Sequence, residues 1–548
     1  MDAAEIIQRT DKLMQDRQPY ESLWSDVRDY LYPDGPSGNL QDVKGQENRD
    51  RIVSNFGEVT LDEAAADLAA MSANPATVWK SLKALDPEDE KDYAVRVALE
   101  QANLRMLSVY AAAASRFEVA YPQALREFLA YGTAIIYLAD RPGQIPLFSP
   151  RSVVSCAFSE DENDEVDELV WQVKYAAKKA FEKWGKAVGE KVMKAATDPA
   201  RCMDEFTFRH YVLPRRIYDI GKRDARARPF AEFWVCEDDA EIIAEGGFFE
   251  FPYTVFRTGQ KPGEYYGRGR GAKALAETKM HQRVRRSQIQ GAEKTINPPL
   301  QGPDDGIMGQ VNLRPGAMNY IRAEYWLAGR QGIAPIMTGA RVELGEEFGA
   351  SVKAEIQSAL MRAMFKLPRE PRMPTAHVLA LEEENLRATA PIIGVLQSEC
   401  LGPLDNRLYH MMKRDGAFDD VFQNVQVAFR TEFQSPAARA MRLGHARAFA
   451  QRLEMFMPLF QSQPELIALT DWATAYRDIG DIMGVPAHYD TPPEDFKQQQ
   501  AATQAAMKQK QQLEAGKDMT TMAKNVAPVI EAVAEQQAQA AAPEQAAA

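Results

Sequence analysis

Residues 263–294 read GEYYGRGRGAKALAETKMHQRVRRSQIQGAEK, a Gly- and Arg-rich turn that opens directly onto a long helical pattern. From Arg270 onward this segment carries seven basic residues against only two acids, Glu277 and Glu293. At 3.6 residues per turn, four of the basic residues fall along one stripe: Lys279, Arg283, Arg286 and Lys294. The apolar stripe is thin. Because a helix that is polar nearly all round usually bridges solvent or pairs with neighbouring chains, the segment predicts an assembly rather than a compact monomer.

The composition is that of a soluble globular protein with an acidic balance. The 548 residues are 45% apolar and 26% charged, with a net charge of −13, and the length allows about two to four domains. This charge argues against a general nucleic-acid coat, although not against a protein that touches DNA without binding it tightly. The four cysteines form no CxxC pair, which predicts reduced structural thiols in a cytoplasmic compartment. No signal peptide or membrane span is indicated, since no apolar stretch approaches ~18 residues.

The hydrophobic period changes along the chain and predicts an α+β fold. Helices are expected at 2–31 (two helices, the second beginning at Pro19), 60–71, 88–113 and 117–130. From about 144 to 258 the period shifts toward two, in β-branched and aromatic runs such as ELVWQVKY, FAEFWVC and FFEFPYTVF. A helix near 176–196 is expected to interrupt these strands. The middle of the chain is therefore predicted to be a sheet region on an N-terminal helical layer.

Two long helical patterns, 271–296 and 345–366, flank a Gly- and Pro-rich segment. The first ends at Asn297-Pro298-Pro299, and the intervening residues 297–343 predict a small protruding module. The second places four apolar residues on one stripe: Phe348, Val352, Ile356 and Leu360. We expect the two helices to run antiparallel as a stalk.

The rest of the chain begins with a proline-rich segment, LPREPRMPT at 367–375. This segment predicts a loop, because its prolines strongly disfavour a helix. A long helical stretch resumes near Thr375 with kinks at Pro391 and Pro403, VQVAFRTEF is a further strand candidate, and 436–483 is helical again. Beyond about Lys497 the chain is rich in Ala and Gln and predicts a marginal helix or a disordered tail.

Motifs for catalysis and metal binding are missing from the sequence, so no catalytic residue, metal ligand or cofactor is predicted. GRGRGA at 267–272 has the wrong spacing for a dinucleotide site, and no G-x-x-x-x-G-K-[ST] is present. A conformational role, as a hinge that frees the entry to the helix, is favoured for Gly267, Gly269 and Gly271. The acidic run 160–168 lacks the Gly and Glu of an EF-hand loop and predicts a solvated turn.

Two features have both a structural and a functional interpretation. The basic stripe is either a solvated face, or one that pairs with a neighbour's acids such as Glu346, Glu347 and Glu355, or it contacts phosphates intermittently without reading bases. The acidic run Glu382-Glu383-Glu384 after the proline-rich loop is either a solvated helix start or a ring of carboxylates that keeps DNA from sticking in a lumen.

Four segments in order resemble the head-to-tail connector, or portal, proteins of short-tailed bacteriophages. They are RQPYESLWSDVRDYLYP near the N-terminus, FPYTVFRTGQKPGEYYGRGRGAKAL, MPTAHVLALEEENLRATAPIIGVLQSECLGPL and LTDWATAYRDIGDIMGVP. The resemblance covers about residues 9 to 496. The sequence departs from the family's pattern at Pro374 and His377, and at Arg270, where a proline is common.

The resemblance implies the portal fold, with wing 1–265, stem 266–296 and 344–366, clip 297–343, tunnel loop 367–375, wing and crown helices 376–496, and a tail 497–548. The expected tunnel-loop residues are Pro368, Arg369, Glu370, Pro371, Arg372 and Pro374. The resemblance further implies a ring, usually dodecameric, at one capsid vertex, through which double-stranded DNA is packaged and ejected. This ring is expected to assemble in the host cytoplasm. The implied partners are the terminase large subunit, the tail adaptor or nozzle proteins, and the capsid and scaffolding proteins.

Two other classes remain as alternatives. One is a DNA-packaging enzyme, an ATPase or nuclease, which the absent phosphate cradle and absent metal-carboxylate pattern disfavour. The other is a neck or tail structural protein, which would share the ring but not the order of stem, clip and stem.

Overall fold

The structure is a computed structural model that divides into two compact units. The first comprises Met1–Leu82, Gln101–Gln423 and Thr431–Met441, and the second Lys83–Glu100, Asn424–Arg430 and Arg442–Ala548. The residues described are 1–36, 49–74, 77–219, 224–301, 342–362, 387–422, 427–434, 448–457 and 470–483, with short pieces at 311, 320, 323–324, 334–336, 384, 446, 489, 496, 498–499, 501–503 and 505.

Helices and strands both contribute to the first unit, so the predicted α+β class is confirmed. Its helices are α1 (Ala3–Leu31), α2 (Phe56–Ser72), α4 (Phe117–Tyr131), α5 (Ala177–Trp184), α6 (Glu190–Thr197), α7 (Arg270–Ile296), α9 (Val342–Ala359), the π-helix η6 (Leu396–Leu401) and α12 (Gly402–Arg414). Its strands are β2 (Thr133–Ala139), β3 (Leu147–Arg151), β4 (Cys156–Glu160), β5 (Val166–Ala176), β6 (Glu205–Pro214), β7 (Phe230–Cys236), β8 (Glu241–Phe248), β9 (Tyr253–Arg257), β10 (Leu300–Gln301) and β11 (Ala334–Pro335).

Three elements cross from one unit to the other: β1 (Lys80–Ala84), α3 (Tyr93–Ala111) and β12 (Phe429–Phe433). The second unit contains α14 (Trp472–Met483) and a further helical piece at 448–457, in line with the helices expected over 436–483.

A single helix, α1, replaces the two helices predicted over residues 2–31. Pro19 lies inside it rather than at the start of a second helix. A proline in a helix interior removes one backbone hydrogen bond. Buried side chains on both sides of Pro19, including Ile6, Leu13, Trp24 and Val27, hold the two halves on one core, so packing outweighs the lost bond.

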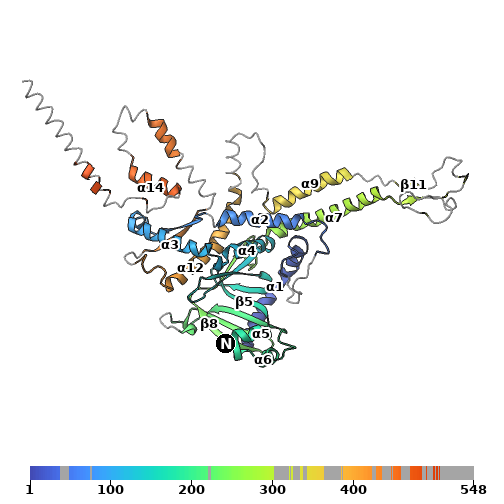
Figure 1. Cartoon of the computed structure of the whole chain (residues 1–548), viewed down its shortest axis with the longest axis horizontal. Helices are drawn as coiled ribbons and strands as arrows, with labels where there is room; N and C mark the ends of the chain where they lie inside the picture. Colours follow the sequence, from blue (N-terminus) through green and yellow to red (C-terminus); the bar gives the residue numbers. More distant parts are fainter. Residues whose placement is uncertain are drawn as a thin grey trace, which may run out of the picture. The chain divides into compact units, whose positions relative to one another are not determined.

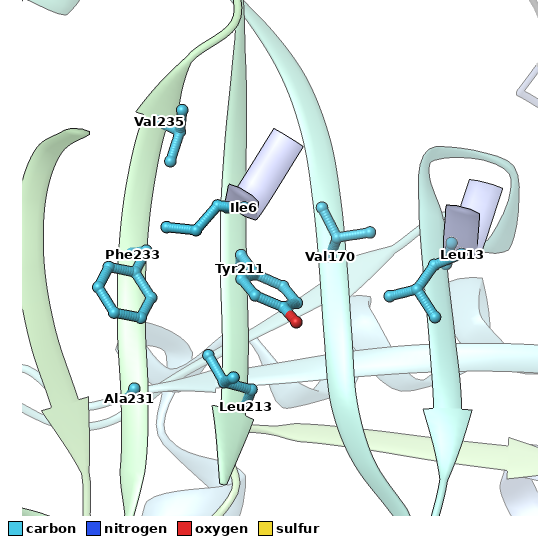
Figure 2. Packing of buried hydrophobic residues seen from close by; sticks show 9 residues of the cluster. Ile6, Leu13, Val170, Tyr211, Leu213, Ala231, Phe233 and Val235 are labelled. Atoms are coloured by element: carbon cyan, nitrogen blue, oxygen red, sulfur yellow. The ribbon is translucent and has the colours of Figure 1, made fainter. Parts of the chain in front are cut away.

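The largest sheet among the described strands of the first unit is five-stranded and antiparallel, in the order β4-β5-β6-β7-β8. Its strands alternate between two faces because successive side chains point in opposite directions. On one face Tyr211 and Leu213 of β6 and Phe233 and Val235 of β7 pack against Ile6 and Leu13 of α1 (Figure 2). Arg209, on the same face of β6, donates to Asp11 of α1 at 2.7 Å. The amphipathic face of α1 is therefore used to cover the sheet.

The opposite face of this sheet carries two short helices, α5 and α6, where one helix was predicted near 176–196. Ala180 of α5 and Val192 of α6 pack against Phe208 of β6 and Trp234 of β7. Gly185 divides the two helices with a positive φ of 59°. Strand β8 was not predicted, because EIIAEGGF carries two glycines that lower its strand signal.

A second, three-stranded sheet in the order β3-β2-β9 lies under α4. Gly132 ends α4 with a positive φ of 91°, and TAIIYL follows as β2, as the sequence predicted. The strand candidate VQVAFRTEF contributes β12, which pairs with β1 in a separate two-stranded sheet rather than returning to a large sheet. Helix α9 ends at Ala359 rather than at the predicted Lys366. Just after its end, Met361 adopts a positive φ of 63°.

A buried ion pair between Lys80 and Asp405 joins two segments far apart in the sequence. Lys80 is 0% exposed, and its ammonium group bonds the Asp405 carboxylate. Thr431 and Tyr110 donate their hydroxyls to the same carboxylate at 2.6 and 3.3 Å. Burial lowers the pKa of Lys80, while Asp405 opposes this shift. The carboxylate is thus fully paired only while the lysine is present.

We expect Lys80→Met to lower the free energy of unfolding by about 3–5 kcal/mol, because it leaves a buried carboxylate without its counter-charge. Denaturant unfolding followed by circular dichroism measures the loss. The double variant Lys80→Met/Asp405→Leu should recover most of it, and the exposed Lys179→Met serves as the matched control. A loss in Lys80→Met no larger than in the control would contradict the role of this pair.

A second buried ionisable group, Glu127, lies near the end of α4. Its Oε2 accepts a hydrogen bond from the backbone N–H of Val153 at 3.0 Å. Burial is the largest influence and raises the pKa of Glu127 from 4.5 to about 7, although the bonds from Val153 and Ser152 oppose it. Because the folded state favours the protonated form, this group stabilises the fold fully below pH 4.5, and that contribution is lost as pH rises through about 7.

Glu127→Gln is expected to remove this pH dependence. Relative to the parent, the variant should gain stability between pH 5 and pH 8, on the order of 3 kcal/mol, because the glutamine stays neutral where the glutamate ionises. Thermal unfolding across that pH range measures the difference, with the exposed Glu182→Gln as control. Parallel pH curves for the parent and Glu127→Gln would show that the carboxyl titrates normally.

Candidate functional site: the paired helices α7 and α9

Helix α7 has a buried root and an exposed outer half. The residues buried along it run from Gly271 to Gln282 and include Ala274, Leu275 and Thr278. Here the helix packs against α1 and α4. From Arg283 to Ile296 its side chains are exposed or half-buried. The thin apolar stripe seen in the sequence is therefore enough to pack the root of α7 against α1 and α4. The outer half packs instead against α9, which lies beside it (Figure 1).

The glycines before and within the start of α7 allow a close backbone approach to the end of α4. A Cβ atom on Gly267 would lie 2.2 Å from the carbonyl oxygen of Gly132, and one on Gly271 would lie 2.5 Å from that of Ala130. For Gly269 the nearest backbone atoms would be 2.6 Å away. None of these three has a positive φ, so glycine is needed here because a side chain would collide with the backbone at the end of α4. Their role as a hinge stays a prediction.

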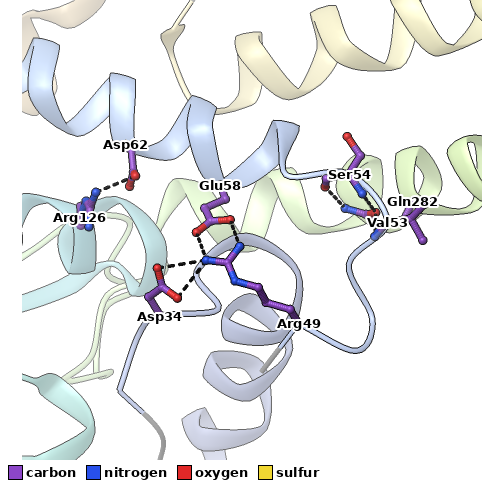
Figure 3. Close-up of polar contacts among 8 residues, drawn as sticks. All are labelled: Asp34, Arg49, Val53, Ser54, Glu58, Asp62, Arg126 and Gln282. Atoms are coloured by element: carbon purple, nitrogen blue, oxygen red, sulfur yellow. Dashed lines mark hydrogen bonds and ion pairs between the residues drawn. The ribbon is translucent and has the colours of Figure 1, made fainter. Parts of the chain in front are cut away.

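Gln282 ties α7 to the loop before α2. Its side-chain oxygen accepts from the backbone N–H groups of Val53 and Ser54 at 2.8 and 2.9 Å, and its amide donates to the Ser54 carbonyl at 2.7 Å (Figure 3). Beside it, Arg49 bridges Glu58 at 2.9 Å and Asp34 at 3.1 Å. These bonds satisfy loop backbone groups and hold the loop on the root of the stalk.

Two glycines on α9 let it approach α7 closely. Gln288 of α7 donates its amide to the Gly345 carbonyl at 2.6 Å, and the same amide nitrogen would lie 3.4 Å from a Cβ on Gly349. Further along, Glu277 of α7 faces Glu355 of α9. Burial, followed by the contact with Glu355, raises the pKa of Glu277. The Gln288 side chain of α7 thus packs against two glycines of α9, while two carboxyls face each other further along the pair.

The four residues of the basic stripe have different surroundings. Lys279 forms an ion pair with Asp26 of α1 at 2.9 Å and lies 5.1 Å from the centre of the Tyr30 ring. Arg283, Arg286 and Lys294 are exposed and have no ion-pair partner among the described residues. The inner end of the stripe is therefore used within the chain, while the outer three charges face solvent.

Comparison with known proteins extends these observations. A family described as "Bacteriophage head to tail connecting protein" matches residues 3–489. This chain belongs to the bacteriophage head-to-tail connecting protein family. The predicted family and the predicted function as a head-to-tail connector of the phage particle are therefore confirmed.

Curated relatives of this connector agree with the assignment. The portal protein of Salmonella phage epsilon15 is 23% identical over 525 residues, covering 92% of this chain and 93% of its own. A probable portal protein of Bordetella phage BPP-1 is 23% identical over 523 residues, covering 92% of each. Among solved structures, a chain of the virion of a native gene transfer agent particle matches with a TM-score of 0.31 at 11% identity, covering 78% of this chain and 93% of its own. None of these proteins is named as an enzyme.

Several residues predicted for the connector's channel fall outside the described residues. They are the tunnel-loop residues Pro368, Arg369, Glu370, Pro371, Arg372 and Pro374, together with Glu382 and Glu383. Glu384 is described and exposed. Of the predicted protruding module, the described part contains β10 and β11, which pair antiparallel at Leu300 and Pro335.

Sequence reasoning missed Gln282 and Gln288, which form polar contacts of α7, and His281 and Lys353, which line a cleft between α7 and α9. Only the spacing of Gly345 and Gly349, one helical turn apart, offered a signal for close helix packing. Where the chain is described, no helix is both long and apolar enough to cross a bilayer. Within the same residues, no three His, Cys, Asp or Glu side chains gather as metal ligands, and all four cysteines are free.

Gly271→Ala is expected to destabilise the connector by about 1–3 kcal/mol, because its methyl group overpacks against the backbone of Ala130. Gly394→Ala is the matched control, since Gly394 is exposed in a helix and a Cβ added there would meet no described atom within 4 Å. The control should be neutral or more stable, by up to about 1 kcal/mol. Thermal unfolding compares the two, and equal midpoints would rule out the tight contact.

Proposed function

We propose that copies of this connector form a closed ring, expected to be dodecameric, at one vertex of the phage head, with double-stranded DNA passing through its centre. One observation carries this proposal. The outer stalk exposes large apolar side chains: Ile296 is 85% exposed, Phe348 51% and Ile289 40%. Ile289 and Ile296 are two helical turns apart on one face of α7, and apolar side chains that gather on an exposed face mark a surface that meets another chain. A ring covers such faces on every copy without leaving open ends.

The roles of the parts follow from the family. We propose that α7 and α9 form the stem, that residues 1–265 form the wing, and that 297–343 form the clip. In this arrangement the clip docks the terminase large subunit during packaging and later the tail adaptor or nozzle proteins. Capsid and scaffolding proteins are the proposed contacts on the head side. The ring has no catalysis of its own and is assembled in the host cytoplasm.

The negative net charge of the chain fits a protein through which DNA moves better than one that binds DNA tightly. Each phosphate that a protein neutralises adds a salt-dependent contribution to DNA affinity, and strong binding would stall a moving duplex. The net charge is −13, and only the outer three residues of the basic stripe are exposed without a described ion-pair partner. We propose that Arg283, Arg286 and Lys294 either contact phosphates transiently or pair with acids of the next copy.

The two alternatives make different predictions. A packaging ATPase or nuclease would hydrolyse ATP or cleave DNA, and one point substitution would abolish that activity. A neck or tail protein would form a ring but would not bind the terminase large subunit. Neither alternative is favoured by a contact in the described part of the chain.

Purified protein should sediment as a large ring and show, in electron micrographs viewed down its axis, a channel wide enough for duplex DNA. Phe348→Ser together with Ile289→Ser should lower the yield of rings, because these side chains are expected to lie between copies. Met203→Ser is the matched control, since Met203 is an exposed apolar residue outside α7 and α9. A protein that stays monomeric under all assembly conditions would overturn the proposal.

A further inference from the structure

A polar cleft of about 310 Å³ lies between α7 and α9. From α7 it is lined by His281, Arg285 and Gln288, and from α9 by Lys353 and Glu346. With a share of roughly 30 Å³ per water molecule, the space exceeds what a single water needs. The cleft is therefore large enough for a small polyatomic ion.

Within the described part of the chain, the cationic groups in this cleft form no ion pair. Arg285 donates to the Gln288 side-chain oxygen at 3.3 Å, which leaves most of its N–H groups available. The Lys353 ammonium lies 5.4 Å from the centre of the Phe56 ring, and no described carboxylate pairs with it. Glu346 is the one acid among the described residues that line the cleft. Two positive charges on facing helices are thus opposed by a single negative charge.

His281 adds a buried polar atom without a partner. The residue is 2% exposed, and its Nδ1 has no hydrogen-bond partner among the described residues. Leaving such an atom unpaired costs about 1–3 kcal/mol. The ring packs on Phe56 with a centroid distance of 5.6 Å, so it is held in place on the wall of the cleft. Burial, and after it Lys353 and Arg285, lower the pKa of His281.

We propose that this cleft binds a phosphate-type oxyanion through Lys353 and Arg285, beside the buried ring of His281. Arginine binds oxyanions with two parallel N–H bonds, and lysine adds a point charge. The anion would neutralise the like charges that α7 and α9 place against each other and would join the helices at this level. Its source is either free inorganic phosphate or a phosphodiester of DNA. The inference goes beyond the proposed ring, because binding to a single chain does not depend on the number of copies.

Isothermal titration of the full-length protein with inorganic phosphate, at constant ionic strength, tests the site. Lys353→Met is expected to weaken binding about tenfold or more, equal to about 1.4 kcal/mol. Lys353→Arg, which keeps the charge, should bind, and Lys273→Met, an exposed lysine on α7 outside the cleft, should bind like the parent.

Two further readouts separate a local effect from misfolding and identify the source. Phosphate should slow hydrogen exchange in α9 of the parent protein and should not do so in Lys353→Met. A short duplex that displaces phosphate, in a manner dependent on Lys353, assigns the ligand to the DNA backbone, whereas a duplex that does not displace it assigns free phosphate. Phosphate binding that is absent, or equal in the parent and Lys353→Met, would overturn the proposal. Both results are independent of whether the protein forms rings.

Discussion

The close backbone approach between the end of α4 and the start of α7 is the contact on which the rest of the stalk depends. Gly132 turns the chain from α4 into β2, while Gly267, Gly269 and Gly271 bring the later segment against the same turn. At these distances a Cβ atom on either side would collide with backbone. The direction in which α7 leaves the sheets is therefore set by sterics at its root, and Gln282 then holds the loop before α2 against the helix.

Beyond that root, α9 buries Val352 and Ile356, and polar contacts join it to α7, although like charges also face each other across the pair. Gln288 bonds the backbone of Gly345, Glu277 faces Glu355, and His281 and Arg285 share a cleft with Lys353. The outer part of the pair, where Phe348, Ile289 and Ile296 are exposed, gains little from burial within one chain. It has more to gain from an added anion or a neighbouring copy, which is a physical reason for a connector subunit to be stable alone at its sheets and to be completed elsewhere by assembly.

The sheet region of the first unit, in contrast, is stabilised as an ordinary domain. The five-stranded sheet is covered on both faces, by α1 and by α5 with α6, and buried charges such as Lys80 and Asp405 are paired. Glu127 is the exception, since its burial favours the neutral form. This covered sheet contrasts with the outer parts of α7 and α9, which expose the apolar side chains that we propose meet another copy.

By itself, the sequence determined the α+β class, the order of strand and helix regions, the bounds of α4 and α7, and the family, because periodicity and turn residues act locally and the motifs occur in order. It did not reveal that Pro19 lies within one helix, that EIIAEGGF pairs as β8, or that α9 ends at Ala359. Only the tertiary structure decided these, because packing on a distant surface can outweigh a local preference. It also decided that Lys279 bonds Asp26 while His281 and Lys353 meet across a cleft, since such pairs depend on how separate helices are placed and leave no pattern in a single stretch of chain.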